Sequence, residues 1–160
     1  MKNIVLVRID DRLIHGQVVT AWVKQCNATR IMIVDDPLTK DAFMTKILKA
    51  AAPPQMSVEV RTAAAAAELL KEEAQDGENI LILVKTPQVL ENLIQNGVEI
   101  TAIILGGMGA KAGRKKFTKN VSASEEEVAS MKRMMERGVA IQYQLVPDER
   151  PVNVLKLIAE

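Results

Sequence analysis

The amino-acid sequence predicts a single α/β domain, residues 1–160, with a mostly parallel central sheet covered by helices on both faces. Short runs of β-branched residues alternate along the chain with longer segments of helical periodicity, which is typical of repeated strand–helix units. The chain has 160 residues, of which 48% are hydrophobic. That length suits one domain, and that composition supplies one sizeable core.

Apolar runs bounded by turn residues predict five strands, and the segments between them predict four helices. The strands are expected at residues 4–9, 30–34, 57–61, 80–84 and 100–105, and the helices at 16–26, 41–52, 63–74 and 87–96. Helix-breaking and helix-capping residues agree with these limits. Pro53 and Pro54 end the second helix, Thr62 can cap the third, and Gly77 and Gly97 follow helix ends.

The pattern loosens after residue 105, through a glycine-rich turn and a basic stretch. It resumes with a helix that starts at Ser124, because Glu127 completes a capping box there. A strand at 139–145 and a short terminal segment at 152–158 are expected to complete the fold.

Charge and composition exclude several classes of function. The formal net charge is +1 and 2% of the residues are aromatic, so neither a phosphate-binding surface for nucleic acid nor a base-stacking platform is indicated. Cys26 is the single cysteine, which excludes an internal disulfide and a cysteine-cluster metal site. No signal-peptide pattern and no apolar run of about 18 residues is present, so a cytoplasmic protein is expected.

Polar residues and glycines follow the predicted strands. Because the carboxyl ends of parallel strands share one edge of a sheet, these residues form one candidate rim. After the first strand come Asp10, Asp11, Arg12 and His15; after the second Asp35 and Asp36; after the fourth Lys85 and Thr86; and after the fifth Gly106, Gly107 and Met108.

His15, the single histidine, lies at the junction between the first strand and the first helix. Near pH 7 much of its imidazole is neutral, so one ring nitrogen can attack phosphorus. The free amides that follow, near Gly16 and Gln17, favour a bound oxyanion. Arg12 offers a planar fork to phosphate oxygens, and Asp10 can fix one imidazole tautomer. These residues together predict a phosphohistidine site.

The segment 6–18 resembles the active-site segment of IIB components from the mannose/fructose/sorbose class of bacterial sugar phosphotransferase systems. Similar landmarks follow in the family's order at 34–36, 85–87, 105–108, 121–122, 146–147 and 151–153. The chain departs from the family pattern at 109–112, where relatives carry a bulkier residue and a nearby glutamate.

The resemblance implies a phosphoryl carrier with about seven strands, one of them an antiparallel edge strand. A IIA phosphohistidine would phosphorylate His15, and membrane IIC and IID partners would present the sugar, so the carrier would sit at the inner face of the membrane through them. Arg12 and Asp10 match neighbouring family positions, and Arg8, Lys85 and Thr86 are further candidates. No cofactor or metal is implied and a homodimer is compatible. The sugar stays open among mannose, fructose, sorbose and amino sugars.

Two other hypotheses compete with the carrier. The aspartates at 10, 11, 35 and 36 with Lys85 suggest a receiver-like or magnesium-dependent phospho-aspartate domain. Against it, the third strand ends at Arg61 without a phosphoacceptor aspartate, and Arg12 and His15 would have no role. The other competitor is a scaffold without chemistry.

Two remaining motifs have simpler interpretations. The glycine pattern at 107–112 fits a loose dinucleotide fingerprint, but the segment after it lacks the apolar periodicity of the required helix. The basic run, Arg114, Lys115, Lys116 and Lys119, is interpreted as a solvated loop, with docking to an acidic partner or to anionic lipid as the alternative.

Overall fold

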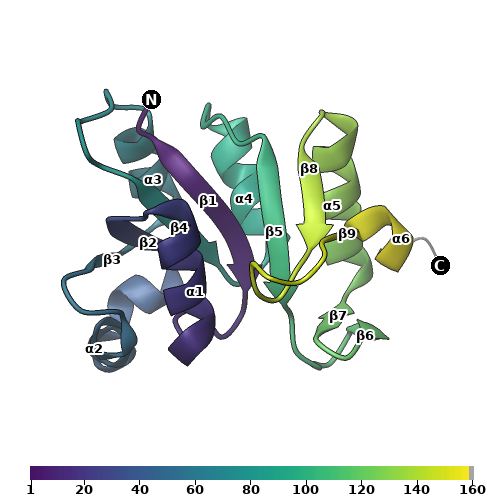
Figure 1. Ribbon diagram of the computed structural model, residues 1–160. Coiled ribbons are helices and arrows are strands. Elements are labelled where there is room, and N and C mark those ends of the chain that lie inside the picture. The colour runs from purple at the N-terminus through teal and green to yellow at the C-terminus, as the bar shows by residue number, and fades with distance from the viewer. Residues whose placement is uncertain (159–160) are drawn as a thin grey trace.

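The protein's structure, a computed structural model, describes residues 1–158 and has a seven-stranded sheet at its centre (Figure 1). The strand order is β3-β2-β4-β1-β5-β8-β9. The bounds are β1 Ile4–Asp10, β2 Arg30–Val34, β3 Ser57–Arg61, β4 Ile80–Val84, β5 Ala102–Gly107, β8 Ala140–Tyr143 and β9 Val152–Asn153. Every pairing is parallel except that of β9 with β8. The predicted fold class and antiparallel edge strand are confirmed; residues 159–160 of the predicted domain lie outside the described residues.

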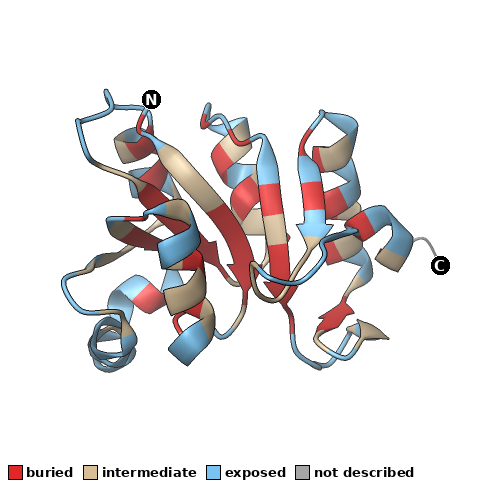
Figure 2. Ribbon diagram, in the orientation of Figure 1, coloured by how far each residue is buried: buried red, intermediate tan, exposed pale blue. Residues whose placement is uncertain are grey.

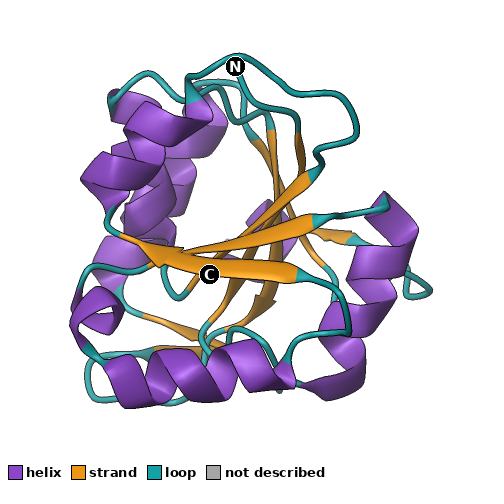
Figure 3. Cartoon of the chain, turned by 90° about the vertical axis from the view of Figure 1, so that its left-hand side faces the viewer, coloured by secondary structure: helices purple, strands orange, loops and turns teal. Residues whose placement is uncertain are grey.

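Helices cover both faces of this sheet (Figure 3). They are α1 Gly16–Cys26, α2 Ala42–Ala51, α3 Ala63–Leu70, α4 Pro87–Gln95, α5 Glu125–Glu136 and α6 Val154–Ile158, with a short 3-10 turn, η1, at Pro37–Lys40. Trp22 of α1 and Leu48 of α2 belong to one hydrophobic cluster, whereas Leu90 of α4 and Met131 of α5 belong to the other. Neighbouring residues of one strand join different clusters, Leu83 the cluster of Trp22 and Ile82 the cluster of Leu90. Figure 2 shows buried residues in red along the central strands.

Predicted caps hold the starts of two helices. The Thr62 hydroxyl accepts a hydrogen bond from the Ala65 amide at 3.1 Å at the start of α3. At α5 the capping box is complete: the Glu127 amide donates to the Ser124 hydroxyl at 3.1 Å, and the Ser124 amide donates to the Glu127 carboxylate at 2.9 Å. Both helix starts therefore follow from local sequence chemistry.

Most predicted limits agree with the structure to within one residue, but four predicted elements differ by more. The third helix ends at Leu70 instead of residue 74, because residues 71–77 are all exposed and offer no apolar face to pack. The fifth strand is shifted to Ala102–Gly107, so two glycines predicted in a turn lie within the strand, where Gly107 pairs with Asp10. The strand predicted at 139–145 spans only Ala140–Tyr143, and the terminal segment divides into β9 and α6.

A small hairpin, absent from the prediction, follows β5. It pairs β6 (Lys115–Thr118) with β7 (Val121–Ala123), and Val121 and Ala123 are buried against the core. Its lysine-rich first strand hid the pattern, because only Phe117 there is a large apolar residue. The hairpin brings the predicted basic stretch back toward the end of β5.

The carboxyl ends of β4, β1 and β5 lie next to one another at the lower edge of the sheet in Figure 1. The first residues of α1 lie at this same edge. The fold thus places the segment after β1 where open α/β sheets bind their ligands. Among the described residues, no helix has both the length and the apolar composition needed to cross a bilayer.

Candidate functional site

A tight turn between β1 and α1 presents His15. The Leu13 amide donates to the Asp10 carbonyl at 2.9 Å, and Leu13 adopts a φ of +58°, a left-handed conformation that is uncommon outside glycine. Leu13 and Ile14 are buried, which holds the turn down. His15 then occupies the N-cap of α1, but its side chain makes no capping hydrogen bond. The imidazole is therefore free for another role.

Asp10 is the centre of the site. Its fully buried carboxylate accepts hydrogen bonds from His15 Nε2 at 2.9 Å, from the Arg12 amide at 3.1 Å and from Arg12 Nε at 3.3 Å. Burial alone would raise the pKa of Asp10, but the hydrogen bonds from His15 and Arg12 outweigh burial and the pKa is lowered. Asp10 is therefore ionised at neutral pH.

The ionised Asp10 fixes the state of the His15 ring. A carboxylate can only accept hydrogen bonds, so Nε2 must carry the hydrogen that lies between the two side chains. In the neutral ring this leaves the lone pair on Nδ1. The His15 side chain is 22% exposed, so this nitrogen belongs to a ring that a docking molecule can reach.

Arg8 lies beneath this pair instead of at the surface. Its side chain is 1% exposed and donates to the carbonyls of Gln144 and Leu145, both at 2.9 Å, and to Asp10 at 3.4 Å. The guanidinium also lies 5.3 Å from the centre of the Trp22 ring. The candidate role of Arg8 as a phosphate ligand is therefore corrected: burial and these partners make it a support for Asp10.

Arg12 is the accessible cation of the site. Its side chain is 51% exposed, although it also donates to Asp10. Gly107 lies beside it: a Cβ at that position would come within 3.5 Å of both the Arg12 guanidinium and the Asp10 carboxylate. Arg12 can therefore swing toward a ligand at His15 from a tethered position.

The remaining candidates divide between the rim and the core. Gly16, with a φ of +51°, and Gln17 are exposed at the start of α1, next to His15. Thr86 is the N-cap residue of α4, and Lys85 lies 3.8 Å from Asp35 on the neighbouring strand end. Gly106 and Met108 are buried, and Met108 packs in the core, so its predicted place in the site is wrong.

The carboxylates at 35 and 36, which the receiver-like hypothesis requires, do not form a cluster with those at 10 and 11. Asp35 accepts a hydrogen bond from the Leu38 amide at 2.9 Å, and Asp36 accepts one from the Ala63 amide at 2.8 Å, so both serve local structure. Strand β4 separates their strand from β1. Within residues 1–158, no three histidine, cysteine, aspartate or glutamate side chains lie close enough together to hold a metal ion.

Sequence reasoning missed the support from the segment after β8. Gln144 and Leu145 contribute only their backbone carbonyls, and Leu145 also accepts a hydrogen bond from Trp22 Nε1 at 3.0 Å. Backbone groups leave no residue-type signal. The one hint was an arginine at position 8 inside an otherwise apolar strand, which demands buried partners.

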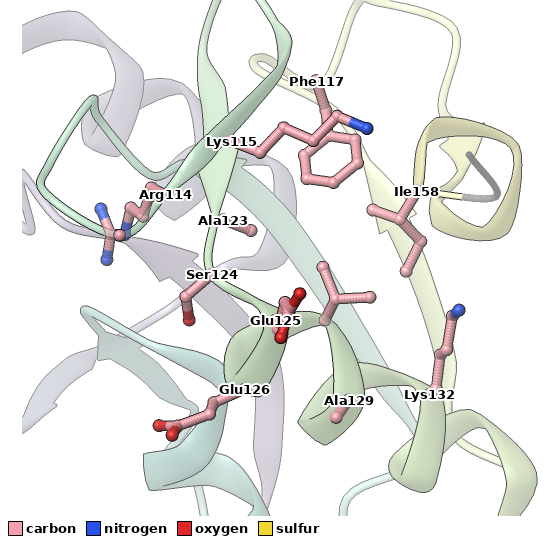
Figure 4. A pocket seen from close by; sticks show the side chains of 12 residues that line it. Arg114, Lys115, Phe117, Ala123, Ser124, Glu125, Glu126, Ala129, Lys132 and Ile158 are labelled. Atoms are coloured by element: carbon pink, nitrogen blue, oxygen red, sulfur yellow. The ribbon is translucent and has the colours of Figure 1, made fainter.

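His15 lines neither of two hollows on the described surface. A hollow of about 930 Å³ lies between the β6–β7 hairpin, α5 and Ile158 (Figure 4). A second, of about 560 Å³, runs between α1 and residues 146–148 and includes Gln17. The His15 side chain lies outside both hollows and is 22% exposed, which suits reaction with a group carried by another macromolecule.

The family model described as the PTS system sorbose subfamily IIB component matches residues 4–160. The chain belongs to this family of phosphotransferase-system IIB components. It is 35% identical over 158 residues to the sorbose-specific EIIB component of Klebsiella pneumoniae, covering 99% of this chain and 96% of that protein. The crystal structure of the IIBSor domain of the sorbose permease from Klebsiella pneumoniae has the same fold, with a TM-score of 0.93 at 34% identity, covering 98% and 96% of the two chains.

A longer relative, the mannose-specific EIIAB component of Escherichia coli K12, is 32% identical over 155 residues. The match covers 97% of this IIB chain but 48% of that protein, so the chain spans about half of the mannose-specific relative's length. The resemblance inferred from the segment 6–18 is confirmed at the level of the family.

The lowered pKa of Asp10 predicts an acid-sensitive contribution to stability. Ionised Asp10 stabilises the IIB fold above its unfolded pKa of about 3.9, and this contribution is lost as the pH falls through the lower folded pKa. Urea unfolding of wild type and Asp10→Asn at a series of pH values tests this. The stability difference should shrink between about pH 5 and pH 2. A difference that stays constant down to the acid limit would contradict it.

Proposed function

We propose that this IIB component is a phosphoryl carrier in which His15 Nδ1 accepts the phosphoryl group from a IIA phosphohistidine and passes it to a sugar. The observation that carries the proposal is the bond between His15 Nε2 and the buried, ionised Asp10, because it leaves the Nδ1 lone pair as the nucleophile. The family of the chain and the surface position of the ring support the same conclusion.

Acceptance requires one bond to form and one to break. The lone pair of His15 Nδ1 attacks phosphorus, the nitrogen–phosphorus bond of the donor histidine breaks, and the donor ring leaves with the electron pair. The phosphorylated His15 ring gains positive character, which the Asp10 carboxylate stabilises through Nε2. The transition state is loose and in-line, with charge on the equatorial oxygens, so positioned donors are the main contribution of the protein.

Two sets of donors serve those oxygens in this proposal. The Arg12 guanidinium donates to Asp10 but is half-exposed, so its planar group can also donate to the phosphoryl oxygens. The first amides of α1, at Gly16 and Gln17, have no partner within the helix, and the positive end of the helix favours an anion there. A few donors, instead of a dense cationic cage, suit a group that must leave again.

Onward transfer ends at a sugar hydroxyl: its oxygen attacks phosphorus and releases its proton, while the Nδ1–phosphorus bond breaks and its electron pair returns to Nδ1. In this proposal membrane IIC and IID partners deliver the sugar, and the carrier acts at the cytoplasmic side of the membrane without a cofactor. The EIIAB relative, whose name joins the A and B designations in one protein, supports a IIA partner. The sugar is set by those partners, so the residues of this chain leave it open.

Replacement of Arg12 by alanine is predicted to slow phosphoryl transfer by about a hundredfold, because a donor to the equatorial oxygens is lost. The fold should persist, since a half-exposed ion pair contributes at most about 1 kcal/mol. Stopped-flow or quenched transfer rates and urea unfolding measure the two effects. Arg137→Ala is the matched control, an exposed arginine that follows α5 at the opposite edge of the sheet. Equal rates in both variants would remove Arg12 from the mechanism.

The chemical stability of the label tests the proposal against its competitor. Phosphohistidine survives base and is lost in acid, whereas an acyl phosphate on aspartate is lost in base. Purified chain incubated with its phosphorylated IIA partner should take up one base-stable, acid-labile phosphoryl group. A base-labile label would support the receiver-like alternative, and no label at all would support a scaffold.

A further inference from the structure

Asp11 adjoins the central Asp10, but the proposed transfer gives its carboxylate no chemical role. The structure shows instead that it fastens the site turn to the end of β5. Its backbone amide donates to the Gly107 carbonyl at 3.1 Å, and its carboxylate accepts from the Gly109 amide at 2.8 Å. The hydrogen bonds of Asp11 therefore connect the turn that presents His15 to the end of β5 and the segment after it.

Arg114 holds that carboxylate from the other side. One terminal nitrogen of its guanidinium donates to Asp11 at 3.3 Å and to the Gly109 carbonyl at 2.8 Å. Its Nε and its other terminal nitrogen donate to the two carboxylate oxygens of Glu127, at 3.0 Å and 2.8 Å. The side chain is 4% exposed and runs away from the hollow in Figure 4. The interpretation of Arg114 as part of a solvated run is wrong, although Lys115, Lys116 and Lys119 are exposed.

This geometry couples three parts of the fold at the edge that carries His15. Glu127 is the capping-box residue of α5 and is itself buried, so it gives Arg114 a fixed base. The opposite side of the guanidinium faces Asp11 in the site turn. An incoming phosphoryl group is an anion, and an unneutralised carboxylate beside the turn would repel it. Arg114, which Asp11 shares with Glu127, places a buried positive charge against Asp11 and offsets part of that repulsion without occupying the surface itself.

We propose that Arg114 is a positioning residue for phosphoryl transfer at His15, which holds Asp11 in place and offsets part of its charge so that the site turn accepts an anionic group. This inference rests on the proposed carrier function. Arg114 does not touch the reacting atoms. It acts through Asp11, so its effect on the rate depends on the Asp11 charge.

A charge-rescue experiment separates this role from simple structural support. The rate of acceptance is measured with phosphoramidate, a small nitrogen–phosphorus donor, and with the phosphorylated IIA partner, for wild type, Arg114→Gln, Asp11→Asn and the double variant. Arg114→Gln should slow acceptance about tenfold from both donors. Asp11→Asn should change it by no more than about threefold, and the double variant should recover most of the loss.

Arg133→Gln is the matched control, because Arg133 is an arginine of α5 whose guanidinium pairs with Glu91 and not with Asp11. Its rate should stay within about twofold of wild type. If Arg114→Gln does not fold, the same comparison is made in the Glu127→Gln background, where no buried glutamate is left unpaired. A purely structural Arg114 would show no rescue by Asp11→Asn.

The outcomes distinguish the two levels of the proposal. The inference is supported if wild type takes up label, Arg114→Gln accepts the phosphoryl group slowly, and the double variant recovers the rate. The inference is overturned, while the carrier function is retained, if wild type takes up label but Arg114→Gln has an unchanged rate of acceptance. The same holds if the double variant does not recover the rate. Wild type that takes up no phosphoryl group from either donor overturns both.

Discussion

Replacement of His15 by alanine is expected to abolish phosphoryl acceptance, the largest functional effect predicted for any single substitution. The imidazole supplies the nucleophilic Nδ1, and the described residues contain no second histidine to take its place. The fold should be retained, because the side chain makes no capping hydrogen bond in α1 and is partly exposed. Radiolabel transfer from the phosphorylated IIA partner, with circular dichroism on the same samples, measures both properties.

Asp36→Asn is the informative control for this experiment. Asp36 is an exposed carboxylate at the end of β2 that the receiver-like alternative requires, but in this structure it accepts a hydrogen bond from the Ala63 amide. The carrier account predicts full labelling of Asp36→Asn and none of His15→Ala. Acid-labile label that persists on the alanine variant would refute the assignment of His15.

Replacement of Gly106 by alanine is expected to give the largest loss of stability. A Cβ at this position would lie 2.1 Å from a terminal nitrogen of Arg8 and 2.3 Å from its central carbon, so the guanidinium must move. Arg8 is fully buried and would leave both carbonyl partners and Asp10. Breaking a buried, paired charge in this way costs about 3 to 5 kcal/mol.

Gly107→Ala is the matched control for Gly106→Ala. The neighbouring Cβ would meet nothing closer than 3.5 Å, which is an ordinary contact. Urea unfolding followed by the fluorescence of Trp22, the single tryptophan, reports directly on the Arg8 environment. Gly106→Ala should lose several times as much stability as Gly107→Ala. Comparable losses in the two variants would show that the buried guanidinium does not need the space at Gly106.

The sequence predicted most of the fold because the signals for it are local. The apolar runs at β2, β3 and β4 matched the strands, and capping residues such as Thr62 and Ser124 placed helix starts. The shift of β5 has a physical reason that is not local. Position 106 in β5 requires a glycine, because Arg8 of β1 fills the space that a side chain would need. This requirement appears only when β1 and β5 are paired.

The candidate site divides along the same line. Asp10 and His15 lie within six consecutive residues, so their contact could be inferred from the sequence and is present in the structure. The additional bond from Arg12 to Asp10 was not predicted. The partners of Arg8 are 136 and 137 residues away, and Glu127 lies 13 residues beyond Arg114 across a hairpin that was not predicted. Burial of an arginine depends on such distant partners, so the sequence identified neither the partners of Arg8 nor the burial of Arg114.

The position of the phosphoryl group on the ring tests the central claim most directly. Protein with nitrogen-15 in the histidine ring is phosphorylated by its IIA partner, and the phosphorus–nitrogen couplings are measured at neutral or basic pH. The bond between Nε2 and Asp10 predicts phosphorus on Nδ1 of His15, with the hydrogen retained on Nε2. Phosphorus bonded to Nε2, or to any other residue, would contradict the account.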